Sequence, residues 1–284
     1  MKIDLHMHST FSDGRLTPTE LVRLLEREQV AVAALTDHDS TEGVAEALAA
    51  AERVPGLRLV SGIEISASHP DTPNAEVHVL GYFIDHRDEE FQRKLSAFRN
   101  DRDVRGRQMV ERLGALGYRL DWERVKEIAG DAGVGRPHIA HAMVERGYVA
   151  EYRQAFDGLL NDGGAAYVGQ THLTTLDAAE MIRDAGGAAV LAHPLYVADH
   201  RRFIPRLAEW GFAGIEVHYA KFTPQERAEL LALAADHGLL PCGGSDFHGI
   251  DAQREQPPGS AGPPPDVFEE LERRAGAPQG PQRV

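Results

Sequence analysis

Seven short runs of apolar residues along the chain are typical of buried β-strands. They are rich in Val, Ile, Leu and Ala, and each of them ends in or next to polar residues. The seven runs are residues 3–8, 31–39, 57–66, 76–84, 188–194, 214–219 and 239–248. Amphipathic segments at 18–28, 41–53, 176–185 and 224–237 predict helices between them, the first and last capped by Thr17 and Thr223. Strand alternating with helix predicts a parallel α/β fold, as a barrel or a doubly wound sheet.

The alternation stops in the middle of the chain. Residues 88–170 show successive helical patterns without a convincing strand. We therefore expect a discontinuous α/β domain of residues 1–87 and 171–284. The helical insertion of residues 88–170 is expected to form a cap over the active site.

Composition restricts the class of protein further. With 284 residues and 42% hydrophobic residues, the chain can bury the core of an enzyme-sized domain. The formal charge of −14 argues against binding of long duplex nucleic acid, although a small anionic ligand can still bind in a local basic pocket. There is one cysteine, Cys242, and no apolar run of the roughly 20 residues that a membrane span needs. We expect a cytoplasmic protein without a membrane partner.

Metal-type side chains gather where the predicted strands end. Residues i and i+2 of a strand project from the same face, so His6 and His8 can share one ion. In parallel α/β folds the active site lies at the carboxyl ends of the strands. The candidate ligands at that edge are His6, His8, Asp13, His38, Glu64, His78, His193, Asp246 and His248. One ion takes about three or four protein ligands, so nine candidates predict two or three divalent ions.

The mixed imidazole and carboxylate set favours Mn²⁺, with Fe²⁺ or Zn²⁺ as alternatives, over Mg²⁺ or Ca²⁺. Two aspartates flank His38. Asp37 and Asp39 are candidates to orient an imidazole or move a proton, or one of them caps the next helix with Ser40. The predicted catalytic set is therefore Asp37, Asp39 and His193.

Five motifs in this order resemble those of the PHP (polymerase and histidinol phosphatase) superfamily. They are "DLHMHSTFSDG", "TDHD", "GIE", "AHP" and "SDFH". The resemblance implies a distorted (β/α)7, TIM-like barrel with a trinuclear metal centre that hydrolyses phosphate esters by attack of a metal-activated hydroxide. It also implies three ligand sets: His6, His8, Glu64 and Asp246; then Glu64, His78 and His193; then Asp13, His38 and His248. Some family members have His in place of Asp13, a change that affects metal preference.

The insertion contains basic residues for substrate recognition. Arg102 and Arg105 lie in or beside an apolar stripe of a predicted helix, formed by Leu95, Phe98, Met109, Leu113 and Leu116. Either these arginines extend past the stripe at the rim of the insertion, or they face the barrel mouth and bind phosphate.

The segment "GVGRPHIAHAM" favours the second interpretation. Its glycines allow a tight loop, Pro137 suits a first helical turn, and Arg136 and His138 lie where a helix N-terminus attracts anions. The "GRPH" part of this segment resembles segments found in the branch of the PHP superfamily that acts on 3′,5′-nucleoside bisphosphates. The resemblance implies conversion of pAp to AMP and phosphate, with Arg102, Arg136 and His138 binding one phosphate.

Three residues near the end of the sixth predicted strand are further candidates. Glu216, His218 and Tyr219 either line the substrate pocket, with the Tyr219 ring stacking on a base, or lie behind the ligands or at the surface.

Other functions remain as alternatives. They are a 5′-to-3′ exonuclease acting on short single-stranded RNA, a histidinol-phosphatase-like phosphomonoesterase, an amidohydrolase barrel, and a non-catalytic domain. The lack of a lysine suited to carbamylation argues against the amidohydrolase, and the complete ligand set argues against a domain without activity.

Overall fold

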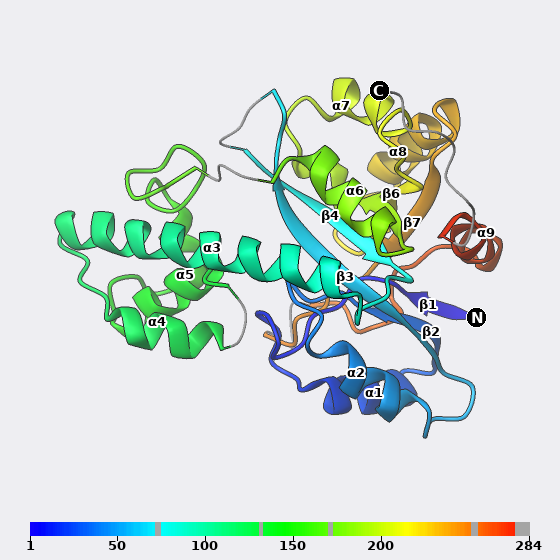
Figure 1. The fold of residues 1–284 in the computed structure, drawn as a ribbon, viewed down its shortest axis with the longest axis horizontal. Helices are drawn as coiled ribbons and strands as arrows, with labels where there is room; N and C mark the ends of the chain where they lie inside the picture. The colour runs from blue at the N-terminus through cyan, green and yellow to red at the C-terminus, as the bar shows by residue number, and fades with distance from the viewer. Residues whose placement is uncertain (72–74, 131–132, 170–172, 251–254, 276–284) are drawn as a thin grey trace.

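Seven strands form one curved sheet at the centre of the computed structural model (Figure 1), which describes residues 1–71, 75–130, 133–169, 173–250 and 255–275. The strands pair in chain order. Their bounds are β1 Lys2–Asp4, β2 Val30–Leu35, β3 Arg58–Ser68, β4 Glu76–Tyr82, β5 Ala188–Leu191, β6 Gly214–Tyr219 and β7 Leu240–Gly244. The Leu5 N–H donates to the Gly243 carbonyl at 3.3 Å, which brings the two ends of the sheet together. The fold is the distorted TIM-like barrel expected from the sequence.

One strand runs against the expected direction. β4 pairs antiparallel with both β3 and β5, whereas the other pairs are parallel. The parallel α/β pattern predicted from the sequence therefore has one exception, β4. Only residues 69–75 link β3 to β4, too few for the helical crossover that a parallel pair requires. As a result, the first residues of β4 lie at the same edge of the sheet as the last residues of β3 and β5. His78 is near the start of β4 and therefore lies at this edge.

The first strand is shorter than predicted. β1 ends at Asp4, but the chain continues beside the segment after β7, because Met7 forms a parallel bridge with Phe247. The His8 N–H donates to the Phe247 carbonyl at 2.9 Å. The alternation that places His6 and His8 on one face therefore persists beyond the strand.

The helices cover the sheet and form the insertion. Those of the barrel are α1 Pro18–Arg27, α2 Val44–Ala51, α6 Thr175–Asp184, α7 His200–Leu207, α8 Pro224–Asp236 and α9 Pro265–Ala275. Thr17 and Thr223 cap α1 and α8 with their side chains, as predicted. α7 was not predicted. A short 3-10 helix, Pro194–Tyr196, follows β5.

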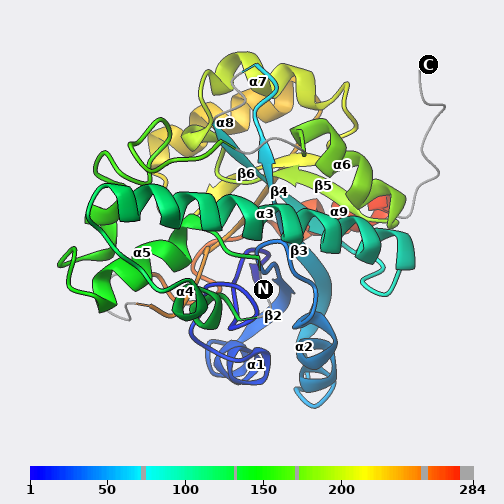
Figure 2. The ribbon, with the colours of Figure 1, turned by 60° about the vertical axis from the view of Figure 1, so that its left-hand side comes forward.

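The insertion contains α3 Glu89–Ala115, α4 Trp122–Ala129, α5 Arg136–Glu145 and the 3-10 turn Tyr152–Phe156. α3 crosses the face of the barrel and extends beyond it to α4 and α5 (Figure 2). Leu95 packs in the barrel core, whereas Met109 and Leu113 pack in a separate core of the insertion. Leu116, predicted to lie on the apolar stripe, is 48% exposed at the end of the helix. The boundaries of the insertion stay a prediction.

In the described ranges, none of the helices combines the length and the apolar character that crossing a bilayer would require.

Candidate metal centre

Glu64 is the centre of a cluster of five imidazoles. It lies in β3, and its side chain is 1% exposed. Its Oε2 lies 3.1 Å from His6 Nε2, 3.3 Å from His8 Nε2 and 3.3 Å from His38 Nδ1, and its Oε1 lies 2.9 Å from His78 Nδ1 and 3.1 Å from His193 Nε2. The five histidines come from four segments that are far apart in the sequence. Closure of the sheet therefore brings these histidines together around the Glu64 carboxylate.

Two further carboxylates extend the cluster. Asp246 Oδ1 lies 3.5 Å from His6 Nε2 and 3.3 Å from His8 Nε2. Asp13 Oδ1 lies 3.3 Å from His248 Nε2, 3.8 Å from His8 Nδ1 and 4.0 Å from His38 Nε2. All nine residues that the sequence analysis selected as ligands thus lie in one connected group.

Two glycines allow the backbone segments to approach each other closely. A Cβ on Gly14 would lie 2.5 Å from the His8 carbonyl oxygen, and one on Gly244 would lie 2.4 Å from the His6 nitrogen. Side chains at either position would push apart the segments that supply the cluster. The loop after β1 and the end of β7 therefore require glycine here.

Three residues at this edge of the sheet have left-handed backbone conformations. Asp39, His193 and Asp246 have φ angles of +50°, +27° and +56°. Such conformations cost about 1–3 kcal/mol each in residues other than glycine, and they concentrate at functional sites. The strain at His193 and Asp246 therefore falls on two of the candidate ligands.

The side chains of the cluster fit divalent metal ions. Three subsets each offer ligand atoms that lie within 4.8 Å of one another: His8, Asp13, His38 and His248; His6, His8 and Glu64; and His38, Glu64 and His78. The Nε2 atom of His8 and the Nδ1 atom of His38 are buried 3.3 Å from Glu64 Oε2, but neither makes a well-directed hydrogen bond among the described residues. Buried ring nitrogens need a partner, and a cation would provide one.

The charges of the cluster also favour a cation. Burial alone would raise the pKa of Glu64, but the neighbouring imidazoles hold it well below its usual range. Burial disfavours protonation of His78 and His248, yet the nearby carboxylates raise the pKa of each to about 10. The carboxylates therefore create a strong demand for positive charge at this edge of the barrel.

Glu216 and Asp4 support the cluster from behind. Glu216 is fully buried; its Oε1 lies 3.0 Å from His6 Nδ1, and its Oε2 accepts the backbone N–H of His193 at 2.8 Å. Asp4 accepts backbone N–H groups of His6, Ser245 and Gly259 at 3.3, 2.9 and 2.7 Å. Of the three positions that the sequence left open for Glu216, in the substrate pocket, behind the ligands or at the surface, the structure gives the one behind a candidate ligand.

Asp37 and Asp39 fix loops beside His38. The Asp37 carboxylate accepts the Ser9 N–H and hydroxyl, both at 2.6 Å, and the Ser12 hydroxyl at 2.7 Å. Asp39 accepts the Ser66 N–H at 2.7 Å and forms a buried ion pair with Arg102. Their assignment as catalytic residues stays a prediction.

A bulge in β6 separates the three residues predicted near its end. The pairing of β6 with β7 shifts between Glu216 and His218, so Tyr219 turns towards the cluster and donates to Asp246 Oδ2 at 2.6 Å. Tyr219 is only 1% exposed, so its ring offers no open face to a base. Burial and the charge of Arg227 on α8 lower the pKa of His218, which lies on the helix side. Simple alternation could not predict this arrangement.

The arginines of the insertion are buried rather than placed at its rim. Arg102 and Arg105 are each 6% exposed. Besides Asp39, Arg102 contacts the Ser66 hydroxyl at 3.0 Å. Arg105 and Arg136 share Glu76, whose Oε2 lies 3.4 and 3.0 Å from their Nη2 atoms.

Two residues near the cluster were missed by the sequence analysis. Glu76 Oε1 lies 3.2 Å from His78 Nε2, and Lys221 Nζ lies 2.8 Å from Asp246 Oδ2. Glu76 precedes His78 by two residues in one strand, so alternation could have indicated it. Lys221 follows the bulge, so alternation along β6 could not indicate its position.

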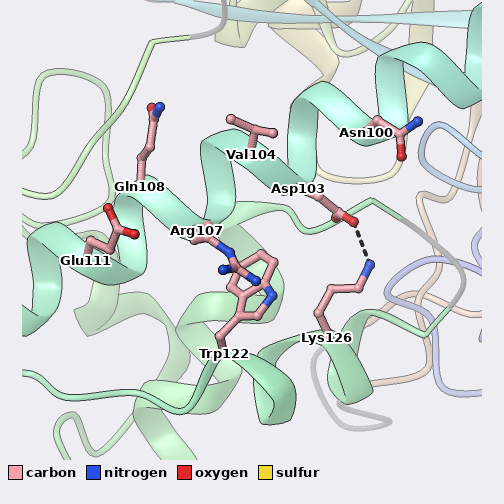
Figure 3. A pocket seen from close by; sticks show the side chains of 8 residues that line it. All are labelled: Asn100, Asp103, Val104, Arg107, Gln108, Glu111, Trp122 and Lys126. Carbon is pink, nitrogen blue, oxygen red and sulfur yellow. Dashed lines mark hydrogen bonds and ion pairs between the residues drawn. The ribbon is translucent and has the colours of Figure 1, made fainter.

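A hollow lies on the outer side of α3, away from the cluster. Asp103, Arg107, Trp122 and Lys126 line it, with Lys126 paired to Asp103 and the Arg107 guanidinium 5.1 Å from the Trp122 ring (Figure 3). Arg102 and Arg105 project from the opposite, buried side of the helix. This hollow is therefore separate from the candidate metal centre.

Comparison with known proteins places these motifs in a family. The family model described as "PHP domain" matches residues 4–160. A 3′,5′-nucleoside bisphosphate phosphatase of Chromobacterium violaceum is 36% identical over 251 residues, which cover 87% of each chain. The 5′-3′ exoribonuclease Rnm of Salmonella typhimurium is 35% identical over 250 residues, covering 86% of this chain and 84% of the relative.

A solved structure is similar over almost the whole length. It belongs to a Chromobacterium violaceum protein described as an amidohydrolase with bound sulfate and no metal. The TM-score is 0.85 at 35% identity, covering 96% of this chain and 97% of the other.

Proposed function

Because the chain belongs to the PHP domain family, we propose that it is a metal-dependent phosphoesterase that removes the 3′-phosphate of 3′,5′-nucleoside bisphosphates, converting pAp to AMP and phosphate. The convergence of five imidazoles on Glu64, with Asp246, Asp13 and His248 in contact with this group, carries this proposal. The relative named as a bisphosphate phosphatase supports the substrate. The sulfate bound by the structural neighbour supports a site for a tetrahedral anion.

The proposed ligands are the nine residues of the cluster, which suit two or three divalent ions, with Mn²⁺ favoured and Fe²⁺ or Zn²⁺ as alternatives. When bound, such ions lower the pKa of water and neutralise charge on phosphoryl oxygens. Glu216 would keep the His6 ring oriented through its hydrogen bond to Nδ1. Tyr219 and Lys221 would likewise fix Asp246 through its Oδ2, leaving Oδ1 towards the imidazoles.

Substrate binding is proposed on the side of the insertion. Arg102, Arg105, Arg136 and His138 surround the N-terminus of α5 and its contact with the barrel, and helix N-termini attract phosphate. Burial in ion pairs fixes the three guanidinium groups before substrate arrives. Such preorganisation reduces the entropy that binding costs.

Hydrolysis of short RNA from the 5′ end is a second candidate function. The Salmonella relative named as a 5′-3′ exoribonuclease has nearly the same identity to this chain as the phosphatase. A small nucleotide and the 5′ end of a short single strand present similar phosphates. The description of the structural neighbour as an amidohydrolase has no such support from these two relatives.

Phosphate or nucleotide release from three substrates tests the proposal. We expect the Mn²⁺-loaded protein to have its highest kcat/KM on pAp, compared with phosphohistidinol and with a short 5′-phosphorylated RNA. A higher kcat/KM on the RNA would favour the exoribonuclease. Lack of turnover of all three substrates while the ions remain bound would refute the phosphoesterase function.

A further inference from the structure

Glu76, the first residue of β4, provides a carboxylate at the junction between the barrel and the insertion. It precedes His78 by two residues, so both side chains project from the same face of the strand. Its Oε1 lies 3.2 Å from His78 Nε2, while Nδ1 of the same ring faces Glu64 at 2.9 Å. The Glu76 side chain is 11% exposed. The ring of this candidate ligand is therefore held between two carboxylates.

The other oxygen of Glu76 faces two arginines of the insertion. Oε2 lies 3.0 Å from Nη2 of Arg136, the first residue of α5, and 3.4 Å from Nη2 of Arg105 on α3. Both guanidinium groups also lie over the Tyr167 ring, at 5.4 and 5.5 Å from its centroid. One carboxylate thus contacts a candidate metal ligand through one oxygen and two helices of the insertion through the other.

The same two arginines hold the part of the insertion that follows its 3-10 turn. Arg105 Nε donates to the Val168 carbonyl at 2.7 Å. Arg136 Nη1 donates to Asp162 at 2.7 Å and to the Leu160 carbonyl at 3.3 Å. Each guanidinium is therefore fixed from two sides, by the insertion and by Glu76. Without Glu76, both groups would lose their contact with the strand that carries His78.

We propose that Glu76 is a positioning residue that aligns the insertion with the metal centre, orienting His78 through Oε1 and both Arg105 and Arg136 through Oε2. Its part in substrate binding rests on the proposed function, whereas its part in metal binding does not. A carboxylate behind a metal-binding histidine fixes the ring and raises its basicity. Shared contacts of this kind hold a site in its productive geometry before substrate arrives.

Glu216 also lies behind the histidines, but its contacts remain within the barrel. It faces the His6 ring and accepts the backbone N–H of His193. Loss of Glu216 should therefore affect metal binding alone, whereas loss of Glu76 should affect the binding of both metal and substrate.

Calorimetric titration of metal-depleted protein with Mn²⁺ tests the first part of the assignment. Glu76→Gln keeps the shape of the side chain but removes its charge, and it should weaken Mn²⁺ binding about 10- to 100-fold. Arg105→Gln should not weaken Mn²⁺ binding, because it removes a positive charge near the proposed ions. Equal weakening by the two variants would overturn the role of Glu76 towards His78.

Steady-state kinetics at saturating Mn²⁺ test the second part, with adenosine 3′,5′-bisphosphate as the substrate. Glu76→Gln and Arg105→Gln should each raise KM about 10-fold, because a guanidinium that binds phosphate is displaced in one variant and absent in the other. In both variants kcat should stay within about threefold of the wild-type value, since the ions are in place. The double variant should have a KM within about threefold of either single variant. Additive effects on KM would overturn the coupling between Glu76 and Arg105.

Arg112→Gln is the matched control for both experiments. Arg112 lies two turns beyond Arg105 on α3, and its guanidinium donates to the Tyr167 carbonyl, so it holds the same part of the insertion. Its replacement should change neither the Mn²⁺ affinity nor KM. Losses in Arg112→Gln as large as those in Glu76→Gln would show that the insertion is merely loosened, and would overturn the assignment.

The double variant also serves if Glu76→Gln does not fold, because it removes one charge of each sign. It should then bind Mn²⁺ about 10- to 100-fold more weakly than the wild-type protein, and an unchanged affinity would overturn the assignment. If the wild-type protein binds Mn²⁺ but hydrolyses no substrate, the proposed function fails while the titrations still decide the role of Glu76. Weaker Mn²⁺ binding by Glu76→Gln than by Arg112→Gln supports that role, and equal binding overturns it.

Discussion

His6 illustrates how single residues in the centre are fixed from two sides. Its Nε2 faces Glu64 at 3.1 Å, and its Nδ1 faces Glu216 at 3.0 Å. A carboxylate behind a metal-binding histidine fixes the tautomer and raises the basicity of the ring. Glu216 would therefore act on the proposed metal through His6 rather than by direct contact.

Replacing Glu216 should weaken metal binding. We expect Glu216→Gln to lower the affinity for Mn²⁺ by about 10- to 100-fold, because the neutral amide is a weaker partner for His6 Nδ1. Calorimetric titration of the metal-depleted protein with Mn²⁺ measures this effect. Glu209→Gln, at an exposed position, controls for the loss of one negative charge. Equal affinities in the two variants would contradict the role assigned to Glu216.

The sequence predicts the elements and the ligands better than it predicts their supporting contacts. Apolar runs and caps such as Thr17 and Thr223 are local signals, so the seven strands and the helices α1, α2, α6 and α8 were predicted at their places in the chain, although β1 ends earlier than predicted. The bulge after Glu216 and the partners of Arg102 depend on pairing between distant segments, whereas the direction of β4 could have been inferred from its short link to β3. Local patterns contain no information about such pairings.

Helix α3 joins the two parts of the molecule through its buried face. Leu95 packs into the barrel core, Met109 into the core of the insertion, and Arg102 lies between them in an ion pair with Asp39. Arg107 projects from the opposite face, over the Trp122 ring (Figure 3). The two arginines therefore experience different environments within a little more than one helical turn.

This difference predicts unequal effects on stability. Arg102→Ala should reduce the free energy of unfolding by about 3–5 kcal/mol, because it leaves the Asp39 carboxylate buried without its cation. Arg107→Ala, its control on the same helix, should cost less than about 1 kcal/mol. Urea denaturation followed by circular dichroism compares them. Similar losses for the two variants would show that the ion pair with Asp39 does not stabilise the fold.

At the scale of the whole molecule, the centre depends on closure of the barrel. His6 and His8 lie near the start of the chain, Glu64 and His78 on the central strands, and Asp246 near the end. Their side chains meet only when β7 has joined the segment after β1. Metal binding by these residues would therefore be coupled to folding of the entire barrel rather than to one local motif.

Phosphate release from adenosine 3′,5′-bisphosphate, before and after removal of metal, tests the central claim most directly. The protein is assayed as purified, after chelation with its metal content measured, and after addition of Mn²⁺. We expect chelation to lower the rate at least about 100-fold, because the ions activate water and neutralise phosphoryl charge, and Mn²⁺ to restore it. An undiminished rate in protein shown to contain no metal would contradict the assignment of these nine residues to a catalytic metal centre.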